Sequence, residues 1–130
     1  MDTMDEQAEP LFFIADLREQ WTSAPRRYPY ITFWRPDDAG YCYALSWAGR
    51  YGRSRVIKGR SYYTKKIYGG RCYERFAVPV DAVLAMAIEP RPGLIDGNAG
   101  PVLPNDGNTR MALRRLRFHL PERAPAQLAA

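Results

Sequence analysis

Few side chains in this sequence could serve as a nucleophile, a general base or a metal ligand. The 130-residue chain has one histidine, His119, and two cysteines, Cys42 and Cys72, thirty residues apart. A zinc site needs about four ligands at matched spacing, and a serine or cysteine nucleophile would have to recruit the single histidine as its base. We therefore predict no metal site, no cofactor and no catalytic residues, and expect a binding protein rather than an enzyme.

Three carboxylates leave one catalytic alternative open. Asp37 and Asp38 stand between Pro36 and Gly40, and paired carboxylates act as acid and base only in a pocket that shifts the pKa of one of them. Together with Glu74, they would be the acid–base groups of an enzyme that acts on a nucleotide or a nucleic acid. Because Pro, Asp and Gly are favoured in turns, we interpret the aspartate pair as part of a turn.

Basic side chains are concentrated in residues 50–75. This segment has nine basic residues and one acid, hence a net charge of +8, although the whole chain carries only +5. Five tyrosines lie among them: Tyr51, Tyr62, Tyr63, Tyr68 and Tyr73. Cations attract phosphates and aromatic faces can stack on bases, so the segment predicts an anion-binding surface. In the alternative interpretation, the tyrosines are half-buried strand residues and the charges are only solvated.

The candidate binding residues are basic and tyrosine side chains of this segment. They are Arg50, Arg53, Arg55, Lys58, Arg60, Tyr62, Tyr63, Lys65, Lys66, Tyr68 and Arg71. If the cations contact phosphates, the partner is a nucleic acid and binding weakens steeply with salt. If Tyr and Arg instead anchor a protein interface, the partner is a protein.

The composition favours a folded domain that does not enter a membrane. Apolar residues make up 46% of the chain, and no apolar run approaches the ~20 residues of a membrane-spanning helix. The N-terminus is acidic and lacks the basic region of a signal peptide. We expect flexible tails at 1–10 and 121–130, one domain over 11–120, and a cytoplasmic location. Whether the two cysteines pair is left open.

An aromatic β-hairpin is the clearest element in the sequence. Residues 28–35 are rich in aromatic and β-branched side chains, and in residues 41–47 large side chains alternate with small ones. Alternation on the first strand does not tell which of its faces is buried. We predict an α+β fold in which a small antiparallel sheet is built on this hairpin.

Other strands and about two helices are expected around the hairpin. Pro79 can open a helix that runs to about residue 88, because the first turn of a helix does not need its N–H. Asn108 or Thr109 can cap a second helix. The expected strands are 11–17 and 73–78, the helices are 79–88 and 109–119, and residues 54–75 fit a short helix or ragged strands equally well.

The centre of the chain carries a scattered motif. It consists of Trp34-Arg35-Pro36, Gly40-Tyr41, Leu45, Ala48-Gly49, Tyr51 and, further on, Ala77-Val78-Pro79-Val80. This arrangement, over residues 28–88, resembles a pattern in small proteins encoded by tailed phages and prophages. In those proteins the segment after the last tyrosine of the first block is usually acidic and helical, whereas here it is basic.

The resemblance implies a phage accessory protein that acts by binding. We expect an anti-defence inhibitor, such as an anti-CRISPR, that binds a host defence protein or a ribonucleoprotein complex in the host bacterial cytoplasm. The alternatives are direct nucleic-acid binding through residues 50–75, the enzyme considered above, and a structural factor of the virion.

Overall fold

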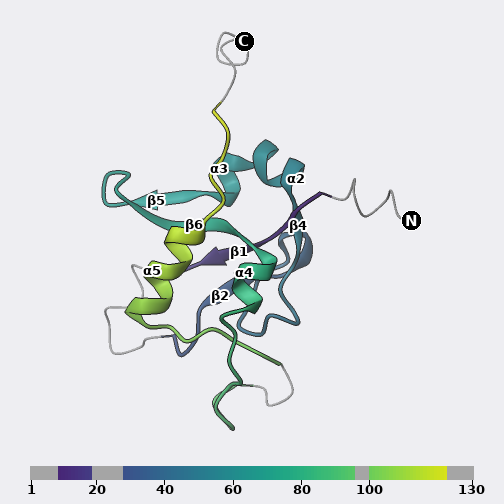
Figure 1. Ribbon diagram of the computed structural model, residues 1–130, viewed down its shortest axis with the longest axis vertical. Coiled ribbons are helices and arrows are strands. Elements are labelled where there is room, and N and C mark those ends of the chain that lie inside the picture. The colour runs from purple at the N-terminus through teal and green to yellow at the C-terminus, as the bar shows by residue number, and fades with distance from the viewer. Residues whose placement is uncertain (1–8, 19–27, 96–99, 123–130) are drawn as a thin grey trace, which may run out of the picture.

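An antiparallel sheet, six-stranded within the described residues, forms the centre of the structure (Figure 1). The computed structural model describes residues 9–18, 28–95 and 100–122. The strands are β1 (Leu11–Asp16), β2 (Thr32–Trp34), β3 (Tyr41–Cys42), β4 (Tyr51–Gly52), β5 (Lys65–Ile67) and β6 (Cys72–Pro79). Strand β1 pairs with β6 on one side and with β2 and β4 on the other, in the order β3-β2-β1-β6-β5. The predicted α+β class with a small antiparallel sheet is confirmed.

Helices cover both faces of this sheet. They are α2 (Arg53–Lys58), α3 (Arg60–Tyr63), α4 (Val80–Leu84) and α5 (Gly107–Leu116), and a 3-10 turn, η2 (Pro36–Asp38), precedes β3. Leu113 of α5 and Val83 of α4 pack on one face, whereas Val56 of α2 and Tyr63 of α3 pack on the other. The described chain therefore has two more helices than the two predicted, over residues 53–63, and the strand β5 follows them.

Both faces of the central strands are buried, which answers the question that the hairpin pattern left open. Successive residues of β1 point to opposite faces of the sheet and belong to different hydrophobic clusters. Phe13 belongs to the cluster under α4 and α5, and Ile14 belongs to the cluster under α2 and α3. In β2, Phe33 and Trp34 divide in the same way. A strand that is covered on both sides is apolar throughout, so simple alternation could not identify a single core face.

The predicted hairpin is present, but both strands are shorter than predicted: β2 covers only Thr32–Trp34 of residues 28–35, and β3 only Tyr41–Cys42 of residues 41–47. Phe33 pairs with Cys42 and Trp34 with Tyr41 across the η2 turn, at one end of the sheet. The second strand, predicted to reach residue 47, ends at Cys42, and the chain then turns so that Leu45 enters the core. The Leu45 N–H bonds to the Pro101 carbonyl at 2.8 Å, a partner outside the hairpin.

The helix starts follow local signals and the helix ends do not. Helix α4 begins directly after Pro79, as predicted, but it ends at Leu84. Helix α5 begins at Gly107, because the Asp106 carboxylate accepts the Thr109 N–H at 2.8 Å and caps the helix. The predicted caps, Asn108 and Thr109, are instead residues of the helix itself.

Several expectations concern the ends of the chain and the cysteines. The predicted tails fall largely at residues 1–8 and 123–130, which lie outside the described residues. Both Cys42 and Cys72 are free thiols. In the described part of the chain, no helix is long and apolar enough to cross a membrane.

A buried carboxylate joins three strands of the sheet. Asp16, at the end of β1, has a side chain that is 4% exposed. Its Oδ2 accepts hydrogen bonds from Arg75 Nε of β6 at 3.0 Å and from Trp34 Nε1 of β2 at 3.3 Å. Its Oδ1 accepts the Arg18 N–H at 3.3 Å. These donors compensate the cost of removing the charge from water.

Replacing Asp16 with asparagine should lower the free energy of unfolding by about 3 kcal/mol, because it leaves the largely buried Arg75 charge without its counter-ion. The matched control is Asp37→Asn, since Asp37 pairs with Arg55 at 3.3 Å but has a side chain that is 88% exposed. That variant should lose less than about 1 kcal/mol. Urea unfolding followed by circular dichroism measures both, and equal losses would contradict the role assigned to Asp16.

Candidate anion-binding groove

The structure divides the predicted binding residues into those that hold the fold and those whose charge remains available. Arg55, Tyr63 and Lys65 belong to the first group. Arg55 forms ion pairs with Asp37 and Asp38, at 3.3 Å and 3.2 Å, and its Nε donates to the Tyr63 hydroxyl at 2.9 Å. Tyr63 is buried. Lys65 forms an ion pair with Glu74. The charges of Arg55 and Lys65 are therefore already paired, and Tyr63 is not accessible to a ligand.

The aspartate pair is part of this structural network. The Tyr63 hydroxyl donates to Asp38 Oδ1 at 3.0 Å, and the Asp38 N–H donates to the Tyr51 hydroxyl at 3.0 Å. Burial raises the pKa of Tyr51 to about 12 and also raises that of Tyr63, so both phenols remain protonated at neutral pH. Asp37 and Asp38 act here as a turn bound to α2 and α3, which agrees with their interpretation as turn residues.

A β-bulge explains why neighbouring lysines of β5 have different surroundings. Lys65 pairs with Arg75 and Lys66 with Tyr73, so the register shifts at Glu74. The Glu74 side chain is 3% exposed, and its Oε1 binds Lys65 Nζ at 3.0 Å. Lys66 lies instead over the ring of Tyr73, 4.9 Å from the ring centroid. The bulge therefore assigns Lys65 to the core carboxylate and leaves Lys66 at the surface.

Lys66 lines a groove that also contains Arg60, another of the residues predicted to bind. This basic groove has a volume of about 610 Å³ and is lined by residues of α3, of the β5–β6 pair and of the segment that follows α5. Its characteristic lining residues are Arg60, Ser61, Lys66, Tyr73, Phe118 and His119. The acidic residue of its wall is Glu122.

The segment after α5 is anchored so that it forms one wall of the basic groove. The Phe118 N–H donates to the Ala77 carbonyl of β6 at 2.8 Å. The Phe118 ring packs against Phe12 with a centroid distance of 4.6 Å, and the Arg53 guanidinium covers it at 5.7 Å. An aromatic anchor and a main-chain bond thus bring the C-terminal part of the domain beside α2 and α3.

Two cations lie on the ring of Tyr73, and one of them, Lys66, lines the groove together with Tyr73. Arg117 Cζ lies 4.4 Å from the Tyr73 ring centroid, and Lys66 lies on the same residue. Burial opposes ionisation of the phenol, but hydrogen bonds from Arg117 and Lys66, together with their charges, outweigh burial and lower the pKa of Tyr73. Neither cation has an ion-pair partner in the described part of the chain, and neither does Arg60.

The remaining predicted residues do not share this site. Tyr62 is 52% exposed and contacts Trp34, and Tyr68 and Arg71 lie at the turn between β5 and β6. The other predicted side chains outside the groove lining are Arg50, Arg53 and Lys58. Of the eleven predicted residues, the groove lining contains Arg60 and Lys66.

Sequence reasoning missed the contribution of the C-terminal segment, which supplies one wall of the groove and places Arg117 on Tyr73. Arg117 and His119 follow α5, more than forty residues after Tyr73, so no local pattern joins them to the basic segment. Tyr73 belonged to the aromatic-rich segment but was not distinguished from its neighbours. The available signal was the run of arginines in the last turns of α5, which predicts a cationic helix end without showing what lies beside it.

Comparisons of this chain with protein-family models, with curated proteins and with solved structures found no match. The phage resemblance therefore stays a prediction. Within the described residues, no group of three or more His, Cys, Asp or Glu side chains could hold a metal ion.

Replacing Lys66 with methionine should raise the pKa of Tyr73, because one of the two cations that favour the phenolate is removed. A pH titration of phenolate absorbance measures this, and the Tyr73→Phe variant identifies the contribution of Tyr73. Lys58→Met is the control, since Lys58 is exposed on α2 and does not contribute to the Tyr73 pKa. An unchanged Tyr73 pKa in Lys66→Met would contradict this arrangement.

Proposed function

We propose that this protein is a non-catalytic binding protein that holds the phosphates of a single-stranded nucleic acid in the basic groove. The observation that carries the proposal is that Arg60 and Lys66 line the same groove as Tyr73 and that Arg117 lies on the Tyr73 ring. None of these three cations has an ion-pair partner among the described residues. Cations that are held together without counter-ions attract an anion, and phosphate is the anion that nucleic acids repeat along their length.

The shape and lining of the groove favour a single strand over a duplex. Its volume of about 610 Å³ is that of a site for a short stretch of backbone. Tyr73 and Phe118 bring aromatic surface to the same place, and the exposed Tyr62 and Tyr68 lie on neighbouring elements. In a duplex the base faces are covered by stacking, whereas a single strand exposes them to aromatic side chains.

A second candidate is the anti-defence inhibitor that binds a host protein or ribonucleoprotein complex. Large exposed aromatic side chains favour it, because Tyr and Trp concentrate binding energy at protein interfaces. Trp47, Tyr62 and Tyr68 are 48%, 52% and 59% exposed. Salt separates the two candidates, since contacts with a protein through aromatic residues lack the steep salt dependence of phosphate binding.

Fluorescence anisotropy with labelled poly(dT), poly(U) and a DNA duplex tests the proposal at low and at physiological salt. We expect the single strands to bind more tightly than the duplex, with affinity falling steeply as salt rises. Lys66→Glu should weaken binding by about tenfold. It should also reduce the slope of log affinity against log salt concentration by about one, which corresponds to the loss of one phosphate contact. The effect should be the same for all sequences, because backbone contacts carry no sequence information.

Arg91→Glu is the matched control for this experiment. Arg91 is exposed, its N–H bonds to the Tyr30 hydroxyl, and it does not line the basic groove, yet the substitution changes the net charge equally. Equal weakening by both variants would mean that only net charge matters and would overturn the groove as the site. An absence of binding at physiological salt would overturn the nucleic-acid function and leave the protein-binding candidate.

A further inference from the structure

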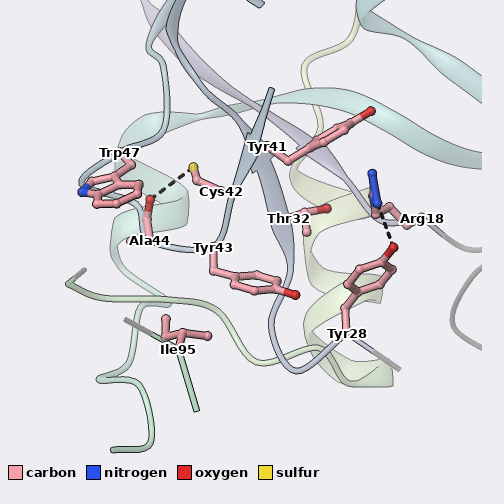
Figure 2. Close-up of a pocket in the computed structure, with 9 residues that line it drawn as sticks. All are labelled: Arg18, Tyr28, Thr32, Tyr41, Cys42, Tyr43, Ala44, Trp47 and Ile95. Carbon is pink, nitrogen blue, oxygen red and sulfur yellow. Dashed lines mark hydrogen bonds between the residues drawn. The ribbon is translucent and has the colours of Figure 1, made fainter. Parts of the chain in front are cut away.

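A second hollow, the aromatic pocket, lies beside the β2–β3 hairpin and shares no lining residue with the basic groove (Figure 2). Its volume is about 310 Å³. The walls are formed by Tyr28, Tyr41, Tyr43 and Trp47, and Arg18 lies at one end between two of the tyrosines. Pockets of this size with aromatic walls and a few placed polar groups are typical of small-molecule sites.

Two of the aromatic walls, Tyr41 and Tyr43, pack on buried aromatic side chains. Tyr43 packs edge-to-face on Tyr30 at 6.0 Å, and Tyr41 packs in the same way on Trp34 at 6.2 Å. Tyr41 and Trp47 nevertheless remain 45% and 48% exposed. The pocket thus offers preorganised aromatic surface to a ligand, and a planar ring can pack against it without displacing a side chain.

The cation of the pocket is also held in place. Arg18 Cζ lies 4.2 Å from the Tyr41 ring centroid and 5.0 Å from that of Tyr28, and its Nη1 donates to the Tyr28 hydroxyl at 2.8 Å. The Arg18 N–H binds buried Asp16. In the part of the chain that the structure describes, the guanidinium has no carboxylate partner, so its charge is available to an anion.

Two neutral groups complete the chemistry of the pocket. Burial raises the pKa of Tyr43, so its hydroxyl stays protonated at neutral pH and can donate a hydrogen bond. Burial also raises the pKa of the Cys42 thiol to about 11, and the thiol donates to the Ala44 carbonyl. Cys42 is therefore a neutral part of the wall and not a reactive thiolate.

We propose that the aromatic pocket binds a small planar aromatic anion, with its ring against Tyr41, Tyr43 and Trp47 and its anionic group on Arg18. The volume admits one ring or two fused rings with one charged substituent. Two sources share this chemistry, an aromatic carboxylate and a nucleoside monophosphate. The inference uses no residue of the basic groove and stands independently of the proposed function.

Isothermal titration calorimetry with indole-3-carboxylate and with uridine monophosphate tests the proposal, with indole and uridine as the uncharged counterparts. We expect one saturable site and tighter binding of each anion than of its counterpart. Arg18→Met should weaken binding of the anion by about tenfold and leave the uncharged counterpart within about twofold. The anion that binds more tightly shows whether the natural ligand is an aromatic carboxylate or a nucleoside monophosphate.

Arg71→Met is the control, because it removes an exposed arginine at the distant β5–β6 turn and should change neither affinity. Amide chemical-shift mapping on the unmodified protein needs no variant, and the shifts should be centred on Tyr28, on residues 41–47 and on the Trp47 indole. The proposal is overturned if neither anion binds saturably, if the shifts are centred on the basic groove, or if a folded Arg18→Met variant binds both anions with unchanged affinity.

Discussion

The buried carboxylate of Asp16 is the interaction on which the arrangement of the domain depends. It lies at the end of the central strand and accepts hydrogen bonds from Arg75 of β6, from Trp34 of β2 and from the main chain of Arg18. Removing one of these donors would leave the buried Asp16 carboxylate with too few hydrogen bonds to compensate its lost hydration. Because each donor comes from a different part of the chain, the carboxylate sets how these parts approach one another, including the one that carries the cation of the aromatic pocket.

Pairing with acidic side chains also separates the basic residues of the chain into two groups, those with a carboxylate partner and those without one. Arg75 and Lys65 turn toward the buried acids Asp16 and Glu74, and Arg55 binds the aspartates of the η2 turn. Each of these pairs removes one cation from the positive surface. The cations that remain in the lining of the basic groove are Arg60 and Lys66, and Arg117, from the far end of the sequence, lies on the ring of Tyr73. The positive charge available at the surface therefore depends on which cations form ion pairs, and it cannot be read from the net charge of residues 50–75.

Tyrosine hydroxyls connect the aromatic side of the core with the turns at its edge. The Tyr51 hydroxyl donates to the Arg35 carbonyl and accepts the Asp38 N–H, while the Tyr63 hydroxyl bonds to the Asp38 carboxylate. These bonds hold Asp37 and Asp38 with φ values of 56° and 60°, a backbone region that few residues other than glycine adopt. The cost of this turn is offset by an ion pair and by satisfied buried phenols.

The sequence by itself determined the local elements. The apolar run of β1, the strand before Pro79, the helix start after it and the hairpin turn all follow from side-chain pattern and turn chemistry, which act between near neighbours. The helix ends and both hairpin strands were predicted too long, and the inward turn of Leu45, which follows the second strand, depends on a hydrogen bond to distant Pro101. The α+β class itself required only the order of these elements.

Tertiary structure alone decided which charges are available and where they gather. Asp16 and Arg75 are far apart in the sequence, as are Tyr73 and Arg117, and they meet because β6 pairs with β1 and the segment after α5 crosses beside β6. A local pattern records the types of neighbouring residues, whereas the partner of a charge depends on strand order and on the path of the chain. The basic segment was thus visible in the sequence, and the basic groove and the aromatic pocket exist only in the folded domain.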